Sequence, residues 1–214
     1  MEYIKNDNLG SVAIRICNAI HENASYLSEV DGATGDGDHG VNMSKGCLLA
    51  MKALRQDMCF SEGMKVIGRT LMMNIGGSMG PIYGTMFTSL NKSTKDQLRI
   101  TKEAFLTALE EALQALMDLA GANVGDKTLI DTLYPAKEAY KKVMETGSDL
   151  TDCIKAMQKG AQEGKEQTKK LIAKVGRASR LGERSIGYLD AGATSCCIIL
   201  LVMGEELLKH IEKE

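Results

Sequence analysis

Apolar residues recur at intervals of three and four along almost the whole chain, which is the period of an amphipathic α-helix. The alternation typical of strands is nearly absent, and the 214 residues include only two prolines. In segment 101–120 an apolar stripe lies opposite a polar one. The pattern predicts eight helices, over residues 8–29, 41–56, 61–75, 80–92, 101–120, 128–146, 149–174 and 193–212.

Glycine clusters separate these helices, and no internal repeat or interdomain linker interrupts them. A chain of this length with 44% apolar residues can bury one substantial core, so a single all-α domain over residues 1–214 is expected. The run Cys196–Met203 is apolar all round. Because such a helix must be buried on most sides, we expect segment 193–212 to pass through the centre of a helical bundle.

Composition argues against several classes of function. A formal net charge of −2 supplies no basic field for nucleic acid, and the longest apolar run is too short to span a bilayer. The first residues lack the charged and apolar regions of a signal peptide. None of the six cysteines forms a C-x-x-C pair, which favours reduced thiols in a core. We therefore expect a cytoplasmic protein with no membrane and no nucleic-acid partner.

The most informative segment places three carboxylates, those of Asp31, Asp36 and Asp38, on a glycine-rich loop before a predicted helix. Carboxylates at this density repel one another unless a cation lies between them, so the loop predicts a hard-metal site. It lacks the closing Glu of an EF-hand, which favours Mg²⁺ over Ca²⁺. The alternative is a solvated acidic turn in which Asp38 or Asn42 caps the helix.

Residues near this loop suit a polyphosphate. His39 follows Asp38 directly and could donate to a phosphate or orient a carboxylate. The loop Gly76–Pro81 has the composition of a phosphate cradle, because glycines allow close backbone approach and a helix start offers free N–H groups. Its alternative is an ordinary tight turn between two helices.

Two further glycine-rich loops need separate interpretations. Segment 121–128 superficially resembles a Walker A motif, but Asp126 stands between Gly125 and Lys127, so we reject a P-loop and leave open that both are simple helix-start residues. Segment 176–187 contains three arginines among small residues, which suits phosphate or carboxylate binding. Surface salt bridges are the alternative.

Four motifs in this order resemble the nucleotide-binding L subunit of dihydroxyacetone kinase. They are Gly-Asp-Gly-Asp-His-Gly-Val-Asn-Met at 35–43, Gly-Gly-Ser-Met-Gly-Pro at 76–81, Gly-Asp-Lys-Thr at 125–128, and the glycine–arginine segment 176–187 with Asp-Ala-Gly-Ala at 190–193. The resemblance covers nearly the whole chain. It implies an eight-helix antiparallel barrel that holds ADP or ATP at one end through two Mg²⁺ ions.

The resemblance also implies roles for individual residues. The metal ligands would be Asp31, Asp36 and Asp38. The nucleotide would be contacted by His39, Asn42, Ser78, Met79, Gly80, Gly121, Leu129, Arg177 and Asp190. Many relatives carry Ser at the position of Met79, so a hydroxyl contact to phosphate would pass to Ser78 or to the backbone. No side chain would act as a nucleophile, because transfer would rest on positioning and charge neutralisation.

The chain contains no segment that resembles the family's substrate domain, so it is expected to act as a subunit. The resemblance implies two partners: a K-type subunit that holds dihydroxyacetone, and a phosphotransferase-system protein that carries phosphohistidine and rephosphorylates bound ADP. Two other functions stay open at this point, namely an L-type subunit that exchanges free ATP for another ketose or polyol, and a non-catalytic nucleotide-binding regulator. A homodimer also stays open.

Overall fold

The structure is a computed structural model that describes residues 1–214, and it is dominated by nine α-helices. They are α1 (Gly10–Glu22), α2 (Ala24–Gly32), α3 (His39–Met51), α4 (Phe60–Asn74), α5 (Met79–Thr94), α6 (Lys102–Ala120), α7 (Ile130–Glu145), α8 (Leu150–Gln167) and α9 (Ala191–Leu207). Three 3₁₀ helices are η1 (Thr168–Lys170), η2 (Arg177–Ser185) and η3 (Leu208–His210). The short strands are β1 (Glu2–Lys5), β2 (Arg99–Ile100) and β3 (Ile211–Lys213).

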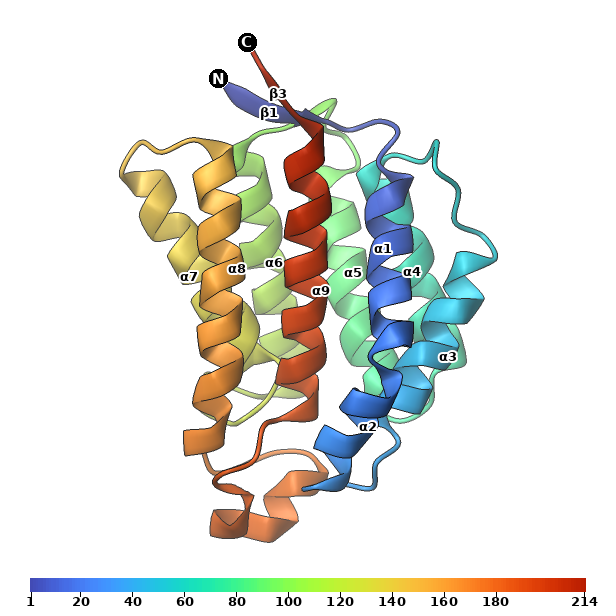
Figure 1. Cartoon of the computed structure of the whole chain (residues 1–214), viewed down its shortest axis with the longest axis vertical. Helices are drawn as coiled ribbons and strands as arrows, with labels where there is room; N and C mark the ends of the chain where they lie inside the picture. Colours follow the sequence, from blue (N-terminus) through green and yellow to red (C-terminus); the bar gives the residue numbers. More distant parts are fainter.

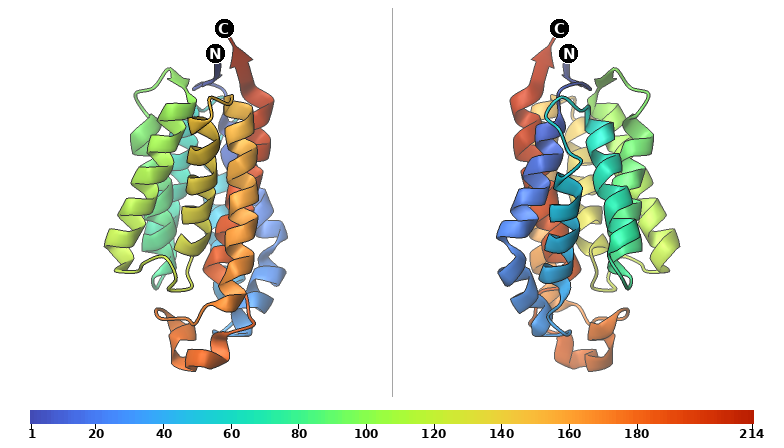
Figure 2. Two further views of the ribbon diagram at one scale, coloured as in Figure 1. Left: turned by 90° about the vertical axis from the view of Figure 1, so that its left-hand side faces the viewer. Right: turned by 90° about the vertical axis from the view of Figure 1, so that its right-hand side faces the viewer.

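Eight long helices form a closed ring (Figures 1 and 2). Each packs against the next in the order α1, α3, α4, α5, α6, α7, α8 and α9, and α9 packs back against α1. Short connections make successive helices run in opposite directions. A cluster of 47 buried apolar residues fills the interior. The prediction of an all-α antiparallel barrel of eight helices is confirmed.

The predicted helix 8–29 is two helices that break at Asn23. The backbone N–H of Asn23 bonds Ala19 O at 3.1 Å, and its side-chain amide bonds the same carbonyl oxygen at 2.8 Å. These bonds satisfy the last turn of α1, so the chain can change direction before α2 begins. The short helix α2 then extends beyond the ring and delivers Asp31 to the loop before α3.

The expectation that segment 193–212 passes through the centre is wrong, because α9 is one member of the ring. Its neighbours in the ring are α1 and α8, and a narrow stripe with Ile198, Leu201, Val202 and Glu205 reaches the surface. With η3 it forms a stretch, Ala191–His210, that is long and apolar enough to cross a membrane, but 67% of the 18-residue apolar segment within it is buried. Side chains, and no ninth long helix, fill the middle of the ring.

Periodicity did not predict a small sheet in which β1 lies between β2 and β3. Ile4 pairs with Ile100 on one side and with Ile211 on the other, both antiparallel. The strands are too short for a visible alternation, and the distant pairing itself specifies them. The sheet gathers both termini at one end, and the glycine-rich loops lie at the other (Figure 1).

Candidate nucleotide and metal site

The three carboxylates of the acid loop (residues 31–38) converge, as the sequence predicts. Asp31 lies in the last turn of α2, and Asp36 and Asp38 lie in the connection to α3. One oxygen from each carboxylate lies within 4.8 Å of the others. Hydrogen bonds from the N–H groups of Thr34 and Gly35 to Asp31 O hold the turn at 3.1 and 2.5 Å. Three acidic groups this close repel one another, and their oxygens fit a hard divalent ion.

A glycine fixes the spacing between the two helices that flank this loop. Gly40, in the first turn of α3, lies so close to α2 that an added Cβ would overlap Ala24 O. Gly37, with φ +76°, turns the chain between Asp36 and Asp38. A residue with a side chain would be strained at Gly37 and would clash at Gly40.

His39 is the first residue of α3, directly after the acid loop, and it is buried, with 7% of its surface exposed. Its backbone N–H donates to Asp31 Oδ2 at 3.3 Å, and its ring Nε2 lies 2.9 Å from Ser195 Oγ in α9. Burial lowers the pKa of His39 to about 4, although the carboxylate of Asp31 opposes this shift. The ring is therefore neutral near pH 7, and its Nδ1 atom has no protein partner and can face a ligand.

A buried chain of hydroxyl groups continues from His39. Ser195 Oγ lies 2.5 Å from Tyr83 OH, and the oxygen of Tyr83 lies 3.2 Å from Gly192 O. These contacts join α3, α5 and the start of α9 in the buried region next to the acid loop. Ser195 and Tyr83 could not be predicted as site residues, because nothing in their local sequence signals contacts with residues more than 100 positions away.

The glycine–arginine segment also reaches the acid loop. Residues 171–188, here called the arginine loop, contain η2 and lie at the glycine-rich end of the barrel (Figures 1 and 2). The guanidinium of Arg177 pairs with the carboxylate of Asp36. The resemblance implies that Arg177 contacts the nucleotide, and this ion pair brings its guanidinium to the acid loop, although both side chains remain about half exposed.

The loop before α5 has the features of a phosphate cradle. Helix α5 begins at Met79, and no side chain caps its start. Gly76, Gly77 and Ser78 are exposed, whereas Met79 packs against the core. A Cβ on Gly80 would overlap Ile75 O, so only glycine fits that position. The first N–H groups of α5 are consequently free for an anion, as the sequence predicts.

The loop before α7 has a structural role beyond that of a helix start. Asp131 Oδ1 accepts from Gly125 N at 2.5 Å, and its Oδ2 accepts from Thr128 N at 2.8 Å. Asp126 pairs with Lys174 at 2.9 Å, and Lys174 N donates back to Asp126 O. The loop does not form the phosphate cradle of a Walker A motif, because the carboxylate of Asp131 already accepts from the backbone N–H groups of Gly125 and Thr128.

The other residues that the resemblance implies lie at the same end. Gly121 ends α6 with φ +58°, and Leu129 is buried at the start of α7. Asp190 caps α9, where its Oδ2 accepts from Ala193 N at 2.7 Å. Burial raises the pKa of Asp190 to about 7, and the bond from Ala193 N partly opposes this shift. A Cβ on Gly192 would lie 3.4 Å from Leu129 N, so the α7 and α9 starts are adjacent.

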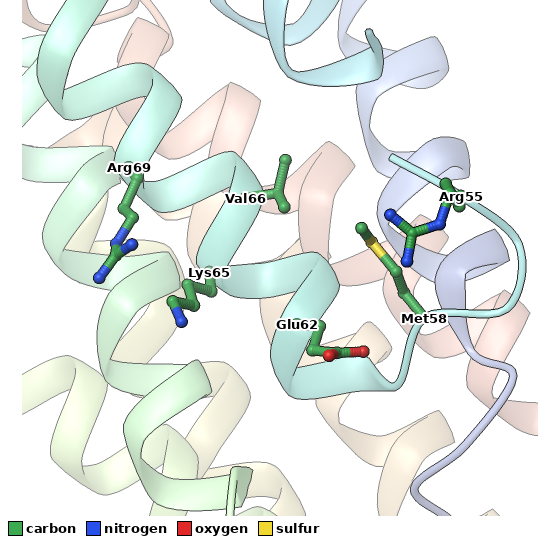
Figure 3. Close-up of a pocket in the computed structure, with 6 residues that line it drawn as sticks. All are labelled: Arg55, Met58, Glu62, Lys65, Val66 and Arg69. Carbon is green, nitrogen blue, oxygen red and sulfur yellow. The ribbon is translucent and has the colours of Figure 1, made fainter. Parts of the chain in front are cut away.

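Two surface grooves lie outside the acid loop. One of about 300 Å³ follows the outer face of α4 and the loop before it, and its lining residues include Arg55, Lys65 and Arg69 (Figure 3). The other, of about 340 Å³, lies between the start of α7 and the end of α8. Neither groove is lined by a residue of the acid loop.

Comparison with known proteins agrees with this geometry. The model of the DAK2 domain matches residues 33–205. The ADP-binding subunit DhaL of a PTS-dependent dihydroxyacetone kinase from Lactococcus lactis is 40% identical over 178 residues, which are 82% of this chain and 84% of that protein. The ADP-binding subunit DhaL of the PEP-dependent dihydroxyacetone kinase 1 from Listeria innocua is 36% identical over 186 residues, which are 86% of this chain and 88% of that protein.

A solved structure shares the fold. The dihydroxyacetone kinase of C. freundii, in complex with AMP-PNP and Mg²⁺, superposes with a TM-score of 0.67 at 22% identity. The match covers 92% of this chain and 33% of that kinase, so this chain corresponds to about a third of the longer protein. Fold, motif order and sequence identity together show that this chain belongs to the DAK2 domain family and is a kinase subunit of the DhaL type.

Proposed function

We propose that this chain is the nucleotide-binding subunit of a dihydroxyacetone kinase, and that it holds ADP or ATP with two Mg²⁺ ions at the loop end of its barrel. It would pass a phosphoryl group from a phosphohistidine protein of the phosphotransferase system to dihydroxyacetone on a separate K-type subunit. The names of the similar DhaL subunits support the ADP-binding role. A cytoplasmic location fits these partners.

The convergence of three carboxylates carries the proposal. Asp31, Asp36 and Asp38 present oxygens within 4.8 Å of one another beside several helix starts. Mg²⁺ takes few protein carboxylates and completes its shell with water and phosphate oxygens, so this set suits a metal–nucleotide complex. When bound, the metal ions neutralise phosphate charge.

Other residues of the chain would bind and orient the nucleotide. The free N–H groups around Ser78, Met79 and Gly80 would hold phosphate oxygens at the start of α5. His39 would donate from Nδ1, and Asn42, one turn into α3, would offer its amide. Gly121, Leu129, Arg177 and Asp190 would surround the rest of the ligand. Catalysis would rest on this positioning, and no side chain needs to form a covalent bond with the phosphoryl group.

The first test measures the nucleotide released when the purified protein is denatured. We expect about one ADP per chain, because a nucleotide carrier must retain its ligand between two transfers. Incubation with a radiolabelled phosphohistidine protein should then convert that ADP to labelled ATP. Rapid exchange with free ATP and no reaction with phosphohistidine would instead favour an L-type subunit for another ketose or polyol.

The matched variants are Asp38→Ala in the acid loop and Asp96→Ala in the exposed turn before β2. Asp38→Ala should abolish nucleotide retention with unchanged helical content, and Asp96→Ala should behave like the parent. Retention of nucleotide by Asp38→Ala would contradict the metal assignment. Robust phosphorylation of dihydroxyacetone by the isolated chain would contradict the subunit assignment, and inactivity with every K-type partner would favour a regulator.

A further inference from the structure

Lys127 is a buried cation that the proposed function does not use. Only 1% of its surface is exposed, and no carboxylate lies within ion-pair distance of its ammonium. Its backbone has φ +63°, a left-handed conformation shared by one other non-glycine residue, Asn8. Both features are costly for a lysine, because a buried charge loses hydration and a Cβ disfavours positive φ. Such a residue needs a compensating role.

The ammonium of Lys127 is satisfied entirely by main-chain carbonyl groups. Its Nζ donates to Leu171 O at 3.2 Å, Ser185 O at 2.5 Å and Tyr188 O at 2.8 Å. An ammonium has three donors, so the match is complete. All three acceptors belong to the arginine loop, one where it begins and two where it returns toward α9. One side chain thus contacts both ends of the loop.

The same loop carries Arg177, which pairs with Asp36 on the far side of the site. Lys127 therefore holds the loop on the α7 side, and the loop places Arg177 against the acid loop between α2 and α3. We propose that Lys127 is a positioning residue for nucleotide binding: it keeps the arginine loop closed and thereby places Arg177. This inference rests on the proposed function.

The chemistry of the site requires a lysine. A methionine of similar length would leave three carbonyl groups without a donor, and these would turn toward water as the loop opens. An arginine would present a planar fork where the three acceptors surround a single nitrogen. Lys174 also joins the arginine loop to the loop before α7, through Asp126, but its contacts hold only the first part of the arginine loop, whereas Lys127 binds both ends.

The test compares Lys127→Met with the control Lys137→Met. Lys137 is also a buried lysine, but it lies within α7 and pairs with Glu138, outside the arginine loop. Without nucleotide, trypsin should cut Lys127→Met within residues 171–188 at least about tenfold faster than the parent or the control, because proteolysis follows the open population. The dissociation constant of Lys127→Met for ADP with Mg²⁺ should be about tenfold higher than that of the parent if the closed population of the loop falls to a tenth. Helical content should stay unchanged.

A double-mutant cycle distinguishes positioning from a general structural role. If Lys127 acts through Arg177, then Lys127→Met should weaken ADP binding much less in an Arg177→Ala background than in the parent. Equal weakening in both backgrounds, or unchanged cleavage in Lys127→Met, would overturn the inference. If Lys127→Met loses its helical signal, Lys127→Gln, which keeps one amide donor group, replaces it in every measurement.

The protease arm also separates this inference from the proposed function. Suppose that the parent binds no ADP, yet trypsin cuts Lys127→Met faster than Lys137→Met. This result would support loop closure by Lys127 but would contradict both the proposed function and the role of Lys127 in nucleotide binding. If the parent binds ADP and Lys127→Met is cut and binds like the parent, the inference alone is overturned.

Discussion

His39 and Ser195 are 156 residues apart in the sequence, yet the ring Nε2 of one lies 2.9 Å from the hydroxyl oxygen of the other. This contact joins the first turn of α3 to α9 in the buried part of the site. It fixes the orientation of the imidazole, because one ring nitrogen is engaged and the other is left for a ligand.

Replacement of Ser195 by Ala should destabilise the protein by roughly 1–3 kcal/mol, since Tyr83 OH and His39 Nε2 both lose a buried partner. Urea unfolding measures the change. Ser93→Ala is the control, because Ser93 is a partly exposed helical serine whose bonds, to its own helix backbone and to Glu111, lie at the surface. Equal stability of the two variants would show that the buried chain of hydroxyl groups contributes nothing.

Stability should fall in mild acid because of His39. Its pKa is about 4 in the folded state, below the ordinary value of 6.5, so the unfolded chain binds more protons between these values. The contribution of neutral His39 to the free energy of unfolding is therefore complete above pH 6.5 and is lost as the pH falls toward 4. From about pH 7.5 to pH 5 the parent should lose about 2 kcal/mol more than His39→Gln, measured by urea unfolding in chelator. Parallel pH profiles would contradict the assignment.

Ligand binding should raise the melting temperature only when the acid loop is intact. ADP with Mg²⁺ at about 100 times its dissociation constant should stabilise the parent by about 2.7 kcal/mol, because the folded state alone binds it. Excess chelator should remove most of this shift, and Asp36→Ala should show none. A chelator-resistant shift would mean that the nucleotide binds without metal.

Gly40 and Gly76 offer a paired test of helix spacing. An added Cβ at Gly40 overlaps Ala24 O, whereas at Gly76 it meets nothing within 4 Å. Gly40→Ala should therefore destabilise by about 1–3 kcal/mol despite the better helix propensity of alanine, and Gly76→Ala should change stability by less than about 1 kcal/mol. Thermal unfolding followed by circular dichroism measures the stability of both variants. A neutral Gly40→Ala would show that α2 moves away freely.

Arg177→Lys should weaken ADP retention more than it affects folding. The planar fork that pairs with Asp36 becomes a single point charge, while the side chain stays on an exposed loop. The stability change should lie within about 1 kcal/mol. Calorimetric titration with ADP and Mg²⁺, set beside thermal unfolding, measures both quantities. Unchanged binding would reduce Arg177 to a salt-bridging residue.

Local sequence was sufficient for the helices and for the acid loop. Apolar spacing marks each long helix, and the carboxylates of Asp36 and Asp38 lie only two positions apart, so their convergence needs no distant partner. It failed at Asn23, where a side-chain bond ends α1 inside an uninterrupted apolar pattern. It also failed for β1, whose pairing depends on residues about 100 and 200 positions away.

The sequence by itself determined the all-α class, the four glycine-rich loops and the residue types that suit a metal and a polyphosphate, because helical periodicity and turn chemistry are properties of neighbouring residues. Only the tertiary structure decided that α9 belongs to the ring, that Ser195 holds His39, and that Lys127 binds the arginine loop. Those relationships depend on closing the ring, which brings together backbone carbonyls and side chains that no local pattern connects.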